Sequence, residues 1–249
     1  MLRRCEAGLL CLLLASCSLA ANAAVGFTLA KGARVGIVNL LDPEVTHYHG
    51  SKAIQDSFMK TQPVGWRIDQ MLADALRDRL SDLALVEVPV AATEAMKHLR
   101  DSCFVESSPA RGLSRECLAP FGHLAAAQQL DAIIVLGPGI NDSAHGRRRK
   151  DIPEYLRGWG FVSGQGAGPT GIPSLFNMTE LLLLSISGEV ASQRGREWGG
   201  SYELPWSDFQ PPADPRVLPG NVLDQLQPLF ADILARQCAR LLEKVEVER

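Results

Sequence analysis

Residues 33–41 read ARVGIVNLL, a compact run of β-branched and aliphatic side chains that predicts a buried strand. Residues 68–80, IDQMLADALRDRL, change to a helical period, with apolar side chains on one face and charged side chains opposite. The runs LALVEV at 83–88 and AIIVL at 132–136 predict two more buried strands. This alternation of strands and helices is typical of a partly parallel sheet with right-handed crossovers.

The segments around these elements have weaker patterns. Short helices are expected from Thr93 and from Ser114, because both residues can act as N-caps. The polar stretch that follows the first strand, up to Gly65, is expected to form a loop or a short irregular element. Residues 137–178 are rich in Gly and Pro, and we expect a long excursion with little regular structure there.

The C-terminal part predicts a hairpin and a closing helix. Residues 179–191 and 197–204 carry apolar side chains at alternate positions, which indicates two antiparallel strands. A Pro-rich linker then leads to an amphipathic helix that begins near Asn221. We therefore expect one α/β domain over residues 24–249, with three layers, a mixed sheet of about five strands, amphipathic helices and a closing C-terminal helix.

The first 23 residues have the pattern of a secretory signal peptide. Arg3 and Arg4 precede an apolar core, LLCLLLA, that is too short to span a bilayer. Two cleavage interpretations remain open. The sequence ANA at 21–23 would release a soluble chain, whereas LASC at 14–17 resembles a lipobox and would make Cys17 the acylated first residue.

The charge balance excludes one class of partner. The chain has a net charge of −3, and loss of residues 1–23 removes two arginines and one glutamate, which changes the net charge to −4. This mild acidity, without a long block of like charge, argues against nucleic acid as a partner. Beyond the signal, no apolar run approaches the ~20 residues of a membrane-spanning helix. No residue pattern points to a cofactor, and we expect none.

Three cysteines lie beyond the signal, namely Cys103, Cys117 and Cys238. Cys103 and Cys117 flank a polar stretch, and a bridge between them would close a loop of about 15 residues and stabilise the fold by about 3 kcal/mol. Because an exported chain meets an oxidising compartment, we expect this disulfide, with two free thiols as the alternative. Cys238 lies on the apolar stripe of the last helix and is expected to be a small buried hydrophobe.

The sequence HYH at 47–49 is a candidate metal site. Alternate side chains of an extended segment point to the same side, so His47 and His49 could bind one ion. No spacing selects a third ligand, which would have to be one of Asp42, Glu44, His98, His123 and His145. A polar loop that contains histidine is the simpler interpretation, and we predict no metal site.

A hydrolase interpretation rests on Asp142, Ser143 and His145, which follow the third predicted strand, where α/β folds carry functional loops. No G-x-S-x-G elbow occurs, so we predict no catalytic residue. The sequence GAGPTG at 166–171 fits the spacing of a dinucleotide-binding motif, but prolines interrupt the residues that follow and no helix comes next. We expect a turn-rich loop there.

Two features of the excursion could contact a partner. Arg147–Lys150 is a basic run that could touch anionic lipid head groups or an acidic protein, although a solvated loop is the simpler interpretation. Trp159 and Phe161 would suit a contact surface if they are exposed. We expect instead that both rings cover the sheet.

The element order of residues 33–245 resembles the small α/β domains of bacterial envelope lipoproteins. The resemblance is carried by the lipobox-like signal, strand RVGIVNLL, helix IDQMLADALRDRL, strands LALVEV and AIIVL, the hairpin and the closing helix. Such domains occur in the curli-export and Pel-export lipoproteins and the penicillin-binding-protein activators, and the N-terminal domain of TolB is similar. The resemblance implies a non-enzymatic envelope role, often inside an oligomer or a secretion assembly.

We therefore expect an exported accessory or interaction protein. It would be an outer-membrane lipoprotein facing the periplasm if Cys17 is acylated, and a soluble periplasmic protein otherwise. Its partners would be envelope proteins or further copies of the chain. The alternative is a periplasmic hydrolase or metal-binding enzyme that uses the 141–145 region or the 47–49 region.

Overall fold

The computed structural model describes residues 27–50, 57–89, 94–106, 115–139, 157–164, 174–186, 190–194, 197–203, 218 and 220–248. Its strands are β1 (Phe27–Leu29), β2 (Arg34–Asn39), β3 (Glu44–Gly50), β4 (Phe58–Pro63), β5 (Ala84–Glu87), β6 (Ala132–Pro138), β7 (Gly158–Gly164), β8 (Ser174–Ser185), β9 (Val190–Arg194), β10 (Glu197–Glu203) and β11 (Val245–Val247). Its helices are α1 (Ile68–Arg77), α2 (Glu94–Arg100), the π-helical segment η2 (Asp101–Glu106), α3 (Arg115–Gln128) and α4 (Gly220–Leu242).

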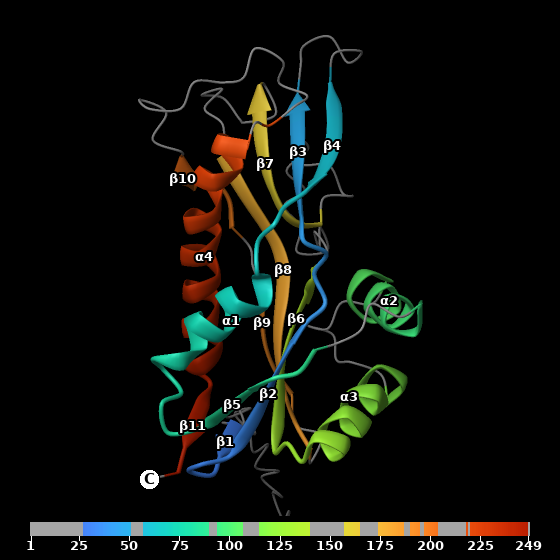
Figure 1. Cartoon of the computed structure of the whole chain (residues 1–249), viewed down its shortest axis with the longest axis vertical. Helices are drawn as coiled ribbons and strands as arrows, with labels where there is room; N and C mark the ends of the chain where they lie inside the picture. The colour runs from blue at the N-terminus through green and yellow to red at the C-terminus, as the bar shows by residue number, and fades with distance from the viewer. Residues whose placement is uncertain are drawn as a thin grey trace, which may run out of the picture.

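The main sheet is built around β8, its longest strand. The strand order is β4-β3-β7-β8-β6-β2-β5, and β9 and β10 also pair with β8. The first half of β8 pairs with β7 and β10, and the second half pairs with β6 and β9. The sheet therefore has two tiers along β8 (Figure 1), an upper tier with β4, β3, β7 and β10 and a lower tier with β5, β2, β6 and β9. β1 and β11 form a separate parallel pair.

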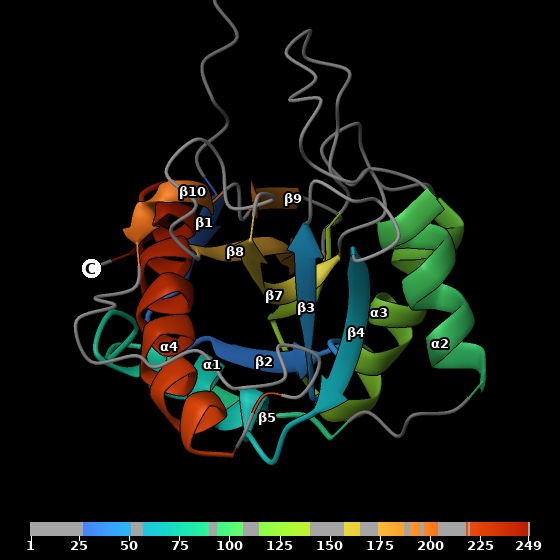
Figure 2. The same ribbon diagram turned by 90° about the horizontal axis from the view of Figure 1, so that it is seen from above.

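The lower tier has the predicted arrangement. β2 pairs in parallel with both of its neighbours, so that Val35 lies opposite Leu85 of β5 and opposite Ala132 of β6. The connection from β2 to β5 places α1 on one face of the sheet, and the connection from β5 to β6 places α2 and α3 on the other face (Figures 1 and 2). α4 packs beside α1. The chain is thus α/β, with helices on both faces of a mixed sheet.

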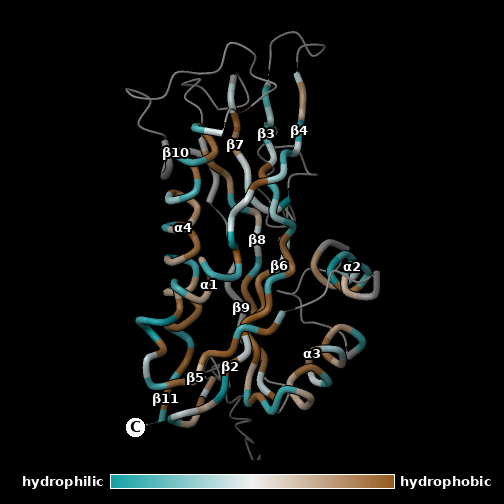
Figure 3. The backbone as a smooth tube through the Cα atoms, in the orientation of Figure 1, coloured by the Kyte–Doolittle hydropathy of each residue, from teal (hydrophilic) through white to brown (hydrophobic). Residues whose placement is uncertain are grey.

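The upper tier corrects two predictions. The polar stretch after β2 forms a hairpin, in which β3 and β4 pair from Glu44–Pro63 to His49–Phe58. The excursion at 137–178 contains β7 and the beginning of β8, which pair with each other. Over the described residues the sheet therefore has nine strands, where the sequence predicted about five. Hydrophilic residues are frequent along β3 and β4 (Figure 3), and pairing across the sheet rather than a local apolar run holds these strands.

The predicted hairpin is also altered. β8 begins at Ser174 and ends at Ser185, so residues 179–191 are not a single arm. β9 folds back on the second half of β8, where Val190 pairs with Leu184. β10 pairs with the first half of β8, where Trp198 pairs with Phe176.

Hydrophobic cores lie on both faces of the sheet, because the buried strands carry apolar side chains on both sides. Leu181 and Leu183 of β8 belong to the core under α1 and α4, and Leu182 and Leu184 belong to the core under α2 and α3. None of the described helices is both long and apolar enough to cross a membrane.

Two glycines allow aromatic rings to lie directly on the sheet. A Cβ atom at Gly137 of β6 would meet the ring of Phe104, and one at Gly160 of β7 would meet the ring of Phe176 and the carbonyl oxygen of Thr46. These two positions exclude any side chain larger than hydrogen unless the rings move.

A disulfide joins Cys103 of η2 to Cys117 of α3, the pair expected from the sequence. Both residues are buried in the core under α2 and α3, and the bridge fixes η2 against α3. Cys238 of α4 is a buried free thiol, as expected, and its burial raises its pKa to about 12.

One polar cluster lies within the core, where α4 crosses β8. The Asn177 amide nitrogen donates to the Gln237 side-chain oxygen over 3.1 Å. The Thr179 hydroxyl lies 2.7 Å from the Asn177 side-chain oxygen and 3.0 Å from the Gln237 side-chain oxygen. All three residues are buried, so these hydrogen bonds replace water for their polar groups.

Candidate functional site

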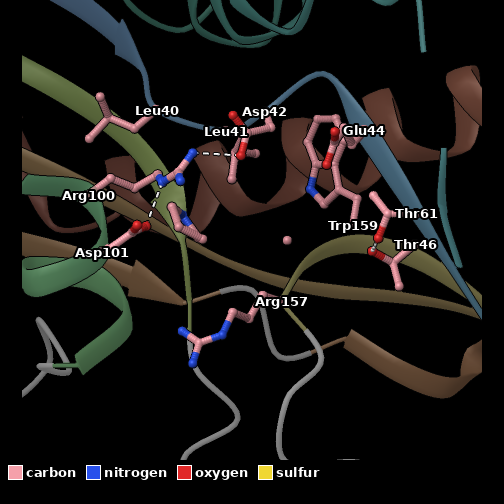
Figure 4. A pocket seen from close by; sticks show the side chains of 12 residues that line it. Leu40, Leu41, Asp42, Glu44, Thr46, Thr61, Arg100, Asp101, Arg157 and Trp159 are labelled. Atoms are coloured by element: carbon pink, nitrogen blue, oxygen red, sulfur yellow. Dashed lines mark hydrogen bonds and ion pairs between the residues drawn. The ribbon is translucent and has the colours of Figure 1, made fainter. Parts of the chain in front are cut away.

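A cleft of about 190 Å³ opens where the two tiers of the sheet meet. It lies just past the carboxyl ends of β2 and β6, at Leu40 and Pro138, and beside the start of β7 at Gly158 (Figure 4). β2 and β6 are adjacent and parallel, so the cleft lies at the edge of the sheet where these strands end, the edge at which open α/β sheets bind ligands.

An ion-pair cluster forms one wall of the cleft. The half-buried Arg100 at the end of α2 donates from Nη1 to Asp42 over 2.6 Å and from Nε to the adjacent Asp101 over 2.8 Å. The hydrogen bond with Asp101, followed by the charge of Asp42, raises the pKa of Arg100 above its usual value. This guanidinium joins the helical layer to the turn between β2 and β3.

Trp159 of β7 forms part of another wall. Its side chain is only 3% exposed, and its ring stacks on Phe230 of α4 with centroids 5.2 Å apart. Trp66 completes this aromatic cluster at 6.4 Å from Trp159. Within the described part of the chain, the indole Nε1 of Trp159 has no hydrogen-bond acceptor. Trp159 and Phe161, which is 2% exposed, cover the sheet as expected and do not form an exposed contact surface.

The remaining polar groups of the cleft are Glu44, Thr46, Thr61 and Arg157. The Thr46 and Thr61 hydroxyls lie 3.3 Å apart across the β3–β4 pair and hydrogen-bond to each other. Glu44 and Arg157 are exposed and lie on opposite sides of the cleft (Figure 4). With Asp42, Asp101 and Arg100, the lining holds three carboxylates and two guanidiniums.

A second polar cluster joins β3 to β7. The Nε2 atom of His47 and the Nδ1 atom of His49 each lie 2.7 Å from the Ser163 hydroxyl oxygen. The single hydroxyl hydrogen can serve only one imidazole, so the other imidazole donates its N–H to the oxygen. Phe58 of β4 stacks on the His49 ring at 5.2 Å, and Phe161 lies 4.8 Å from the His47 ring.

His47 and His49 lie on one side of a strand, as the candidate metal site would require, and the preferred interpretation of this segment as a polar loop is wrong. No sequence pattern indicated Ser163 as a partner of these histidines, because Ser163 and His49 are 114 residues apart in the chain. Only the parallel pairing of β3 with β7, with His49 opposite Ser163, brings them together.

The proposed third metal ligands do not complete this pair. Asp42 and Glu44 line the cleft, whereas His98 and His123 lie on α2 and α3. Among the residues that the structure describes, no three His, Cys, Asp or Glu side chains converge as a metal site.

Several predicted features lie outside the described residues. They are Cys17 with the signal, Asp142, Ser143, His145, the basic run Arg147–Lys150 and residues 166–171.

Comparison with known proteins does not assign the chain to a family. No protein-family model, no curated protein and no solved structure matches the chain.

Proposed function

We propose that this protein is an exported, lipid-anchored component of the bacterial envelope that acts by binding partners. The observation that carries the proposal is the disulfide between Cys103 and Cys117, which lies in a chain that starts with a signal-like segment. Structural disulfides form and persist in oxidising compartments such as the periplasm, and they are rare in the cytosol.

The edges of the sheet support a binding role. Among the described residues, β4 pairs only with β3 and β5 pairs only with β2, so each strand has one edge with no partner strand. A partner strand, or a second copy of this chain, can add to such an edge through main-chain hydrogen bonds. The exposed Met59 of β4 would then contact the added strand.

The anchor is tested by metabolic labelling with an alkyne fatty acid and by detergent phase partition of cells that produce the full chain. Cys17→Ser should abolish the label and move the protein from the membrane fraction to the soluble periplasmic fraction. Cys11→Ser, in the apolar core of the same signal, is the matched control and should keep both the label and the membrane fractionation. Recovery of the uncleaved wild-type chain from the cytosol would overturn the export proposal.

A second candidate function follows from Ser163, whose hydroxyl oxygen contacts two imidazole nitrogens. A serine beside a histidine base is the core of nucleophilic hydrolases. In this candidate, Ser163 would attack an ester carbonyl while His47 or His49 takes its proton and passes it to the alcohol that leaves, and water would then hydrolyse the acyl group from Ser163. A fluorophosphonate probe should then label the wild type at Ser163 but not Ser163→Ala, and labelling that is absent or lies elsewhere would reject this candidate.

A further inference from the structure

We propose that the cleft between the two tiers of the sheet binds a free α-amino acid, whose carboxylate meets Trp159 and Arg157 and whose ammonium group meets Glu44. This inference goes beyond the envelope role and rests on different observations. If no amino acid binds, the evidence for export from the signal-like segment and the disulfide is unaffected. Conversely, if the protein proves not to be lipid-anchored, the cleft can still bind an amino acid.

The first observation is the buried N–H of Trp159. An indole nitrogen only donates hydrogen bonds, and one that is buried without an acceptor is costly. Figure 4 shows this nitrogen on the side of the ring toward the middle of the cleft, and no described residue accepts from it. Phe230 stacks on one face of the ring. The indole therefore offers the cleft a hydrogen-bond donor, and a ligand that supplies an acceptor atom would satisfy it.

The second observation is the distribution of charge. Arg100 is neutralised by Asp42 and Asp101, to which it is bonded. Glu44 and Arg157 make no ion pair with a described residue, and they line the cleft on opposite sides. A simple anion would meet an excess of carboxylates, whereas a simple cation would leave the Trp159 N–H without an acceptor. A ligand with both charges can satisfy both groups.

The third observation is the position and size of the cleft. It lies beyond the carboxyl ends of the parallel strands β2 and β6, the edge at which open α/β sheets bind ligands. Its volume of about 190 Å³ exceeds that of a cavity of about 150 Å³ that holds benzene. It is smaller than the pockets of drug-sized ligands, which start at about 300 Å³. The space therefore suits a molecule of amino-acid size.

The test is isothermal titration calorimetry of the purified full chain with each common L-amino acid, after a screen by thermal shift. We expect at least one amino acid to bind. Its N-acetyl derivative, which lacks the ammonium charge, and its amide, which lacks the carboxylate, should each bind at least about tenfold more weakly.

Variants connect binding to the cleft. Trp159→Phe keeps the stacked ring but removes the N–H donor, and it should weaken binding about tenfold. Trp66→Phe is the matched control, because Trp66 belongs to the same aromatic cluster but does not line the cleft, and it should not change the affinity. Glu44→Gln and Arg157→Gln change exposed side chains, so they should weaken binding in a folded protein even if Trp159→Phe is unstable.

Three results would overturn the proposal. The first is that no amino acid binds to the folded wild type. The second is that binding persists unchanged in Glu44→Gln and Arg157→Gln. The third is that neutral sugars or simple carboxylates bind as tightly as the best amino acid.

Discussion

Replacement of both Cys103 and Cys117 by alanine should lower the free energy of unfolding by about 3 kcal/mol. The bridge spans a sequence separation of 14, and a closed loop of about 15 residues loses this much conformational freedom in the unfolded chain. Alanine is the appropriate replacement because both side chains are buried, and a serine hydroxyl would add an unsatisfied polar group. For a chain of this length, the melting temperature should fall by about 6 to 12 °C.

The assay is urea denaturation followed by circular dichroism, with and without a reductant. The double alanine variant should unfold at a lower urea concentration than the wild type, with a slope that is equal or steeper because its unfolded state is less compact. Reductant should destabilise the wild type to the same extent and leave the variant unchanged.

The reasoning would be refuted if the variant lost less than about 1 kcal/mol, a value far below the loop-closure estimate. It would also be refuted if reductant shifted the unfolding of the double variant, because that variant has no bridge between η2 and α3 to break. Peptide mass mapping of the wild type provides an independent check, since Cys103 and Cys117 should be recovered as one linked pair.

Three further predictions concern the core. Gly160→Ala should lower the free energy of unfolding in urea by about 3 kcal/mol, because the added methyl group would clash with a ring and a main-chain oxygen. As a control, Gly122→Ala lies in a helix where the added methyl group would meet no other atom within 4 Å, and it should stabilise the protein by about 0.5–1 kcal/mol. Gln237→Leu should cost about 1–3 kcal/mol in the same assay, because the buried Asn177 amide would lose its acceptor, and an unchanged midpoint would contradict this. Because burial raises the pKa of Cys238, its thiol should be alkylated slowly by iodoacetamide until urea unfolds the protein. The contribution of the buried, protonated thiol to the free energy of unfolding should be complete below about pH 9 and should decrease as the pH rises toward 12.

The edge of β4 that pairs with no described strand is a place where the protein could assemble with a partner. The strand is short and carries Lys60, and it ends at Pro63, features that natural edge strands use against indiscriminate pairing. A partner that adds to β4 must therefore bring contacts beyond the main chain, and the exposed Met59 is the apolar group available there.

The sequence alone determined the three parallel strands of the lower tier and the helix α1. The strands at 34–39, 84–87 and 132–138 are short apolar runs, and α1 has a clear helical period, so each pattern is local and could be identified without its neighbours. The spacing of Cys103 and Cys117 likewise predicted a short bridge, and alternation placed His47 and His49 on one side.

The tertiary structure decided the upper tier and both candidate sites. β3 and β4 contain many polar residues and β7 is rich in glycine, so these segments are strands because β3 pairs with β4 and β7, and β7 pairs with β8. Ser163 meets the two histidines only through this pairing, and the cleft gathers side chains from residues 40 to 159. The physical reason is that local propensity depends on neighbours in the chain, whereas strand pairing and a cleft depend on contacts between segments far apart in it.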